Sequence, residues 1–213
     1  MLSPYTLNIS NKSNYWEFAE NFSGYSLNVG CGSDTVGDVR IDFTENASGA
    51  NIIGNIEESL PFDDSTFDLV IAYGIIEHMG NPYKFAKEIK RVLKSSGTVS
   101  IVTDNAAYFP IYYPGQRHNG GYRGTISSDR HTMVFHYSHI VELLSFLKFR
   151  NIEIELCYYK EKYRDNGLIT KLTQFMGYNM IRPLIGNAFA QYFMPIIWAR
   201  AINSTSIEIN GKN

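Results

Sequence analysis

The chain has 213 residues, of which 44% are hydrophobic and 19% charged, and its formal net charge is −2 at pH 7. This length suffices for one domain with a real core, and the composition disfavours a disordered chain or a general nucleic-acid-binding domain. No apolar run reaches the roughly 18 residues of a membrane span, and two cysteines are too few for a disulfide framework or a self-contained zinc site. Since the first residues also lack the order of a secretory signal, we expect a soluble cytoplasmic protein, and we assign no metal ligand.

Short apolar runs separated by turns fill the first half of the chain. Residues 14–22 place Tyr15, Trp16 and two further apolar side chains on one side of a short helix. Strands are predicted at residues 25–29, 39–43, 51–56 and 67–73. The last of these is almost continuously apolar, which is typical of a strand buried on both faces of a parallel sheet.

The second half begins with a well-marked helix. Asn81 can cap it, Pro82 suits its first position, and apolar residues at helical spacing follow as far as Leu93. A strand at 98–103, an irregular stretch at 104–137, a helix beginning at Ser138 and strands at 151–159 and 194–202 complete the chain. Strands alternating with helices predict an α/β fold with a mostly parallel sheet.

The glycine turn Gly30-Cys31-Gly32 comes where the first buried strand ends, at the edge where open α/β sheets bind ligands. Asp42, at the end of the next strand, can accept two hydrogen bonds from a ribose diol. A dinucleotide site would need a third glycine that opens a helix, and none follows here. The pattern favours a nucleoside without a pyrophosphate, and a plain tight turn remains the alternative.

Five blocks in order extend this pattern across residues 25 to 103. They are Leu27-Asn28-Val29-Gly30-Cys31-Gly32, Leu60-Pro61-Phe62, Phe67-Asp68-Leu69-Val70, Ile76-Glu77-His78-Met79 and the segment from Glu88 to Gly97. Together they resemble the class I S-adenosylmethionine-dependent methyltransferases, and the chain is similar to their type 11-like family. The resemblance implies a Rossmann-like, doubly wound, mostly parallel seven-stranded sheet with an antiparallel last strand. The short link between Gly32 and Asp42 implies a reduced first helix.

The resemblance also implies S-adenosylmethionine as cofactor and assigns residues to it. Gly30, Cys31 and Gly32 would approach its amino-acid part, and Asp42 would hold the ribose hydroxyls. The remaining assignments are Asn55 and Ile56 around the adenine, and Tyr73 and Gly74 near the sulfonium. The chain departs from the family at Asn28 and Asn55, where an acidic residue is more common.

The catalytic candidates are two histidines. His131 lies in the irregular stretch where this fold places substrate contacts, and the neighbouring Asp129 could orient its imidazole; a surface loop histidine is the alternative. His78 belongs to the Glu-His block, which in the family is mostly a packing feature near the cofactor. His136 and His139 flank the start of the Ser138 helix, and we expect them to cap it or to pack there.

The stretch 104–137 is predicted to be the substrate loop. Its glycines are typical of a lid or binding loop, and its arginines could hold an anionic group, although a solvated loop is an equal alternative. The substrate candidates are Tyr112, Tyr113, Arg117, Arg123 and Arg130. Tyrosine offers a flat apolar face and one hydroxyl, which suits a sugar or another ring.

These patterns divide the chain into four parts. We expect an N-terminal helical cap at 1–24, the methyltransferase core at 25–159, a helical insertion at 160–194, and the last strand with a polar tail at 195–213. The basic, apolar insertion fits packing on the sheet or substrate cavity, a homodimer contact, or peripheral contact with a membrane through residues 160–200.

The leading hypothesis is methyl transfer to O or N of a small molecule or a glycan-type acceptor, without a nucleic-acid partner. A catalytically silent partner or scaffold protein of the same fold is the alternative, and a nicotinamide-dependent oxidoreductase is disfavoured by the missing third glycine. The sequence does not identify the acceptor, the atom methylated or the use of a general base.

Overall fold

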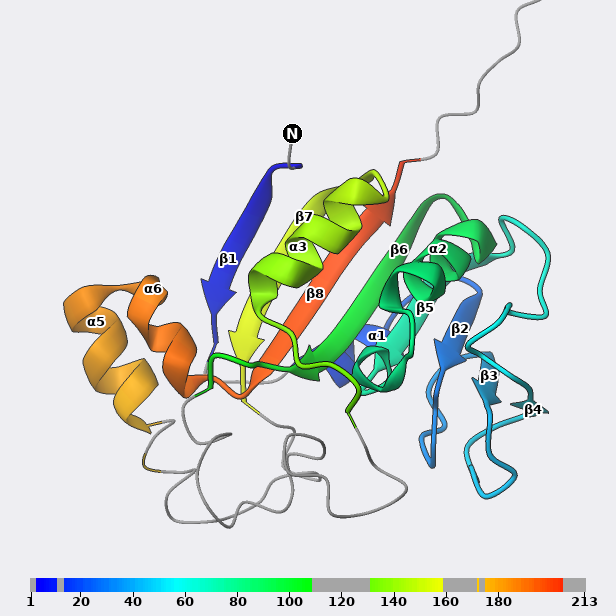
Figure 1. Ribbon diagram of the computed structural model, residues 1–213, viewed down its shortest axis with the longest axis horizontal. Coiled ribbons are helices and arrows are strands. Elements are labelled where there is room, and N and C mark those ends of the chain that lie inside the picture. Colours follow the sequence, from blue (N-terminus) through cyan, green and yellow to red (C-terminus); the bar gives the residue numbers. More distant parts are fainter. Residues whose placement is uncertain (1–2, 11–13, 109–130, 159–171, 173–174, 205–213) are drawn as a thin grey trace, which may run out of the picture.

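The computed structural model describes residues 3–10, 14–108, 131–158, 172 and 175–204. Eight strands form one sheet in the order β1-β7-β8-β6-β5-β2-β3-β4, with β8 antiparallel to both of its neighbours and every other pair parallel (Figure 1). The strands are β1 (Tyr5–Ile9), β2 (Ser26–Val29), β3 (Val39–Asp42), β4 (Ile52–Ile53), β5 (Phe67–Tyr73), β6 (Leu93–Asp104), β7 (Phe149–Cys157) and β8 (Ile196–Asn203). The predicted α/β, mostly parallel fold is confirmed.

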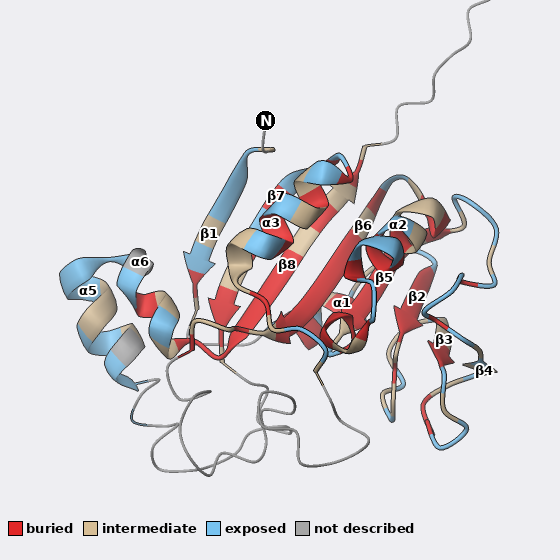
Figure 2. Cartoon of the chain, viewed as in Figure 1, coloured by how far each residue is buried: buried red, intermediate tan, exposed pale blue. Residues whose placement is uncertain are grey.

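Helices cover both faces of the sheet. On one face lie α2 (Pro82–Val92) and α3 (Tyr137–Phe146), and behind the sheet lies α1 (Tyr15–Glu20) (Figure 1). The main core lies between the sheet and the first pair, while Trp16 and its aromatic neighbours form a second cluster on the α1 side. Figure 2 shows the central strands buried, and α2 and α3 exposed on the sides that face away from the sheet.

The helix α2 forms where the sequence predicts it. The side chain of Asn81 accepts a hydrogen bond from the backbone N–H of Lys84, and Pro82 occupies the first turn. Phe85 and Ile89 are buried against the sheet. On its polar side, Arg91 donates to both carboxylate oxygens of Glu88 and also to the carbonyl of Phe62, and the second contact ties the helix to the turn before β5.

Two expectations need correction. The sheet has eight strands instead of seven, because residues 5–9 form β1 and pair in parallel with β7. Residues 1–24 are therefore not a purely helical cap, since β1 precedes α1. In β1 only Ile9 is buried, so the sequence of this strand shows no clear alternation of apolar and polar residues. The reduced first helix is as expected, because residues 30–38 form turns between β2 and β3.

Within the expected insertion, the described residues 176–193 form short helical pieces beside β1. They are the π-helical turn η4 (Met176–Ile181), α5 (Arg182–Ile185), α6 (Asn187–Ala190) and the 3-10 turn η5 (Gln191–Phe193). Several apolar side chains are exposed here, with Leu184 at 80%. No helix among the described residues is both long and apolar enough to span a membrane.

Candidate active site

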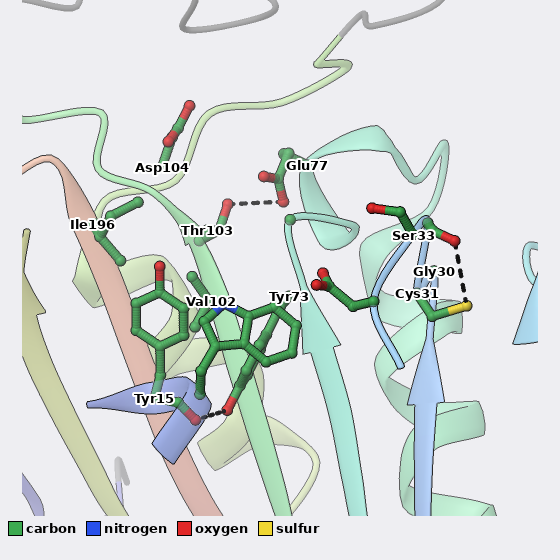
Figure 3. Close-up of a pocket in the computed structure, with 14 residues that line it drawn as sticks. Tyr15, Gly30, Cys31, Ser33, Tyr73, Glu77, Val102, Thr103, Asp104 and Ile196 are labelled. Carbon is green, nitrogen blue, oxygen red and sulfur yellow. Dashed lines mark hydrogen bonds between the residues drawn. The ribbon is translucent and has the colours of Figure 1, made fainter. Parts of the chain in front are cut away.

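Two adjoining cavities lie at the carboxyl ends of the parallel strands, and both are lined by Gly30 and Gly74. The cavity on the β3–β4 side has a volume of about 900 Å³. The cavity on the α1 side is smaller, at about 340 Å³ (Figure 3). This is the edge at which open α/β sheets bind their ligands.

The glycine turn after β2 separates the two cavities. Gly30 has φ +71° and Gly32 has φ +56°, conformations that disfavour other residues. A Cβ atom on Gly30 would lie 2.5 Å from Cγ1 of Ile75, whereas one on Gly32 would meet no atom within 4 Å. Gly49 supports the turn, because its N–H donates to the Gly32 carbonyl and a Cβ atom there would clash with the backbone of Asp34. Sequence reasoning missed Gly49.

Asp42 connects this turn to the larger cavity. It is buried, and its Oδ2 accepts the N–H of Gly32 at 2.9 Å while Oδ1 accepts that of Thr44 at 3.1 Å. Each carboxylate oxygen has room for a further hydrogen bond, so Asp42 can also accept from two neighbouring hydroxyls. This donor and acceptor pattern fits a ribose diol.

An apolar slot follows Asp42 in the larger cavity. Phe43 is 65% exposed there, Ile53 is also exposed, and Ile56 closes the floor. The Oδ1 atom of Asn55 accepts the N–H of Glu57, and the N–H groups of the same amide can donate to a ligand. A planar base between apolar side chains with a polar edge beside an amide would fit this slot.

Aromatic residues line the smaller cavity. The ring of Tyr73 packs edge-on against Tyr15 and Trp16, at centroid distances of 5.3 and 4.9 Å. Its hydroxyl donates to the carbonyl of Tyr15 at 2.8 Å and lies 2.7 Å from Oγ of Ser100, so it is directed toward α1 (Figure 3). Burial raises the pKa of the Tyr73 hydroxyl, which therefore stays protonated.

A cluster of acidic and imidazole groups lies at the outer end of β6. Glu77 is buried and its Oε2 accepts the hydroxyl of Thr103 at 3.0 Å. The rings of His78 and His131 lie edge to face with centroids 4.7 Å apart. Nδ1 of His131 is 3.8 Å from Oδ2 of Asp104, and Figure 3 shows the Asp104 and Glu77 carboxylates on the side of Thr103 away from the aromatic residues. The expected orienting carboxylate, Asp129, lies outside the described residues.

The described residues that line the two cavities include no Lys or Arg, but five of them are acidic. They are Asp34, Asp42, Glu57, Glu77 and Asp104. The cavities therefore favour a ligand that carries positive charge. Cys31 is not a nucleophile here, because burial, followed by the charge of Asp42, raises the pKa of its thiol to about 11.

The structure places every predicted cofactor residue on these two cavities. They are Gly30, Cys31, Gly32, Asp42, Asn55, Ile56, Tyr73 and Gly74. Of the catalytic candidates, His78 lines the larger cavity, and the ring of His131 packs against that of His78. His136 and His139 cap α3 as expected. The substrate candidates Tyr112, Tyr113, Arg117, Arg123 and Arg130 lie outside the described residues.

Sequence reasoning missed the site roles of Glu77, Asp104, Tyr15 and Trp16. Glu77 is adjacent to His78, which could have drawn attention to it. Tyr15 and Trp16 had been interpreted only as the packing face of a helix. Their place in the smaller cavity depends on where α1 crosses the sheet, and the local pattern does not contain that information.

Comparisons with known proteins agree with this geometry. Residues 31–101 match the family model described as a methyltransferase domain. Two uncharacterized proteins of Methanocaldococcus jannaschii are 39% identical over 31% of the chain and 27% identical over 53% of it. The matched regions span 27% and 53% of those curated relatives, so the chain covers at most about half of their length.

Among solved structures, a methyltransferase of Thermotoga maritima, described as a possible histamine N-methyltransferase, is similar with a TM-score of 0.57 at 13% identity. The similarity covers 85% of this chain and 83% of that protein, and at this identity it shows the fold. Residues 31–101 are therefore similar to methyltransferase domains, and the chain has the fold of the S-adenosylmethionine-dependent methyltransferases among the solved structures. The cationic sulfonium of S-adenosylmethionine fits the acidic lining of the cavities.

Proposed function

We propose that the protein transfers a methyl group from S-adenosylmethionine to O or N of a small molecule or a glycan-type acceptor. The observation that carries the proposal is the pair of cavities that meet at Gly30 and Gly74. One cavity offers a carboxylate and an apolar slot for a nucleoside, and the other offers an aromatic pocket for an acceptor group.

The residues divide between these two tasks. Asp42 holds the ribose hydroxyls, Asn55 and Ile56 bracket the base, and the glycine turn admits the amino-acid part of the cofactor. When bound, the cofactor supplies an electrophilic methyl group, so exact placement of the acceptor contributes much of the rate. Tyr15 and Trp16 would offer that acceptor an apolar, aromatic surface to pack against.

The polar end of the acceptor pocket is the cluster at the end of β6. We assign His131 and His78 to contact with the acceptor, because His78 lines the larger cavity, its neighbour Glu77 lines the smaller one, and the ring of His131 packs against that of His78. Thr103 holds Glu77 in place and Asp104 stands beside His131, so the acceptor atom would meet a rigid, negatively charged surface.

Calorimetric titration with S-adenosylmethionine tests the cofactor site. Asp42→Asn should weaken binding by about tenfold or more, because a charge-assisted hydrogen bond contributes about 1.5–3 kcal/mol and tenfold corresponds to 1.4 kcal/mol. Asp38→Asn is the matched control, because this carboxylate binds Ser26 before β3 and lines neither cavity. Absence of binding at millimolar cofactor, or equal loss in both variants, would contradict the proposal.

Activity needs a separate measurement, since a silent scaffold protein of this fold could also bind the cofactor. Release of S-adenosylhomocysteine should be followed by mass spectrometry with a panel of ring-containing alcohols, amines and sugars. His131→Gln should reduce turnover while cofactor affinity stays unchanged. Cofactor binding without turnover of any acceptor in the panel would favour the scaffold alternative.

A further inference from the structure

We propose that Glu77, His78 and His131 bind a divalent transition-metal ion at the junction of the two cavities. One ligand atom from each of these side chains lies within 4.8 Å of the other two. Ligand atoms about 2.1 Å from a tetrahedral ion lie about 3.4 Å from one another, so side-chain movements that bring the ligand atoms closer by up to about 1.4 Å would complete the site.

The donor set indicates the class of ion. Two imidazoles and one carboxylate suit Zn²⁺, Co²⁺ or Mn²⁺ better than Mg²⁺, which prefers oxygen ligands. Glu77 and His78 are adjacent on the turn η1 (Ile76–His78), which follows β5, and His131 reaches them from the segment before α3. The backbone joins these elements, because Thr132 donates from its N–H to the carbonyl of Glu77 at 2.8 Å.

A second group of contacts orients the ligands. The hydroxyl of Thr103 donates to Oε2 of Glu77, which orients that carboxylate. Asp104 lies 3.8 Å from Nδ1 of His131, so a second carboxylate stands beside the imidazole. Carboxylates beside ligating histidines are a regular feature of protein metal sites.

Three protein ligands leave coordination positions for other oxygen or nitrogen atoms. The ion would then bind a hydroxyl of the acceptor and lower its pKa, so that the proton passes to water and the oxygen accepts the methyl group as the bond from that group to the sulfonium breaks. This catalytic role of the ion rests on the proposed methyl transfer. The binding of the ion to the protein does not depend on that proposal. The catalytic role favours an oxygen acceptor over a nitrogen acceptor.

The experiment uses untagged, chelator-treated protein titrated with Zn²⁺ in the calorimeter and with Co²⁺ by visible absorption. The wild type should bind one ion per chain and develop cobalt d–d bands. Glu77→Gln and His131→Gln should each weaken binding at least about tenfold, and Thr103→Val should weaken it by a smaller factor, within the roughly 10–100-fold range of outer-shell changes.

His139→Gln is the matched control. This histidine caps α3 by accepting the N–H of His136, and glutamine at the same position can form the same bond. Its ion affinity should equal that of the wild type. Circular dichroism and the titration with S-adenosylmethionine show whether each variant is folded; if His131→Gln is not, the nearly isosteric Glu77→Gln decides.

The outcomes separate the two proposals. Cofactor binding without ion binding would overturn the metal site and leave the proposed methyl transfer standing. Ion binding that is lost in Glu77→Gln, in a protein that does not bind the cofactor, would do the reverse. Ion binding that is unchanged in Glu77→Gln and His131→Gln, or equally weakened in His139→Gln, would place the ion elsewhere and refute the inference.

Discussion

The substitution Gly30→Ala tests the contact that shapes the cofactor cavity. Gly30 has φ +71°, and a left-handed conformation costs a residue with Cβ about 1–2 kcal/mol. The new Cβ would also lie 2.5 Å from Cγ1 and 2.7 Å from Cδ1 of Ile75, which is only 5% exposed and has little space to move. Overpacking of this kind costs about 1–3 kcal/mol.

These two costs add to about 2–5 kcal/mol, from which a smaller unfolded-state entropy for alanine subtracts about 0.4–1 kcal/mol. The free energy of unfolding from urea titration should therefore fall by about 2–4 kcal/mol. Affinity for S-adenosylmethionine, measured by calorimetry, should fall at least about tenfold, because the turn at Gly30 carries the N–H of Gly32 that Asp42 accepts.

A double-mutant cycle with Ile75→Ala separates the clash from the backbone strain. Ile75→Ala removes Cγ1 and Cδ1 and leaves Cβ, which would lie 2.9 Å from the new atom, so the double variant should regain part of the roughly 1–3 kcal/mol overpacking cost relative to the sum of the single variants. The strain at φ +71° would remain in both backgrounds. Additive losses within about 0.5 kcal/mol would refute the assigned contact, even if Gly30→Ala itself is destabilising.

Three further predictions concern groups around the same edge of the sheet. Glu88→Gln should reduce the free energy of unfolding by about 1.5–3 kcal/mol. The hydrogen bonds from Arg91 lower the pKa of Glu88. The stability that Glu88 contributes is therefore fully present above its ordinary pKa of 4.5 and is lost as the pH falls through the lowered pKa. Below that pH, the free energies of unfolding of wild type and variant, from urea titrations, should converge. Tyr73→Phe should lower the free energy of unfolding, measured by urea titration, by about 1–2 kcal/mol, because the hydrogen bond from the Tyr73 hydroxyl to the carbonyl of Tyr15 is lost. Cofactor affinity should stay unchanged. Cys31 should react slowly with iodoacetamide at neutral pH and faster as pH approaches its pKa of about 11, as followed by mass spectrometry; rapid alkylation at neutral pH in the folded protein would contradict the assigned burial.

Local pattern was enough to predict the central part of the fold. The cap at Asn81, Pro82 and the apolar stripe of α2 lie within a few residues of one another, so the sequence shows them directly. The strand β1 could not be predicted in this way. It is short and largely exposed, and it exists because it pairs with residues near Ile152, far along the chain.

The same distinction applies to the site. Gly32 and Asp42 end neighbouring parallel strands, so their proximity follows from the order of the elements. Glu77 and His131 are brought together because the segment before α3 hydrogen-bonds to the turn after β5 through Thr132. The sequence does not show this contact. Two histidines more than fifty residues apart therefore give no reason to assign a metal ligand from the sequence.

The side of the site around Asp42 and the side around Glu77 differ in the contacts that fix their residues before a ligand binds. On the cofactor side, Asp42 accepts the N–H of Gly32, and Gly49 donates its N–H to the carbonyl of Gly32. The guanidinium of Arg40 donates to the carbonyls of Gly49 and Gly37. A ligand that meets such a surface loses little energy to ordering it. At the other side of the site, the ligand atoms of Glu77, His78 and His131 gather around one point. Removing Asp42 should therefore weaken the cofactor mainly by lost contacts, whereas an ion at Glu77 should add to the stability of the fold itself by binding only its native arrangement.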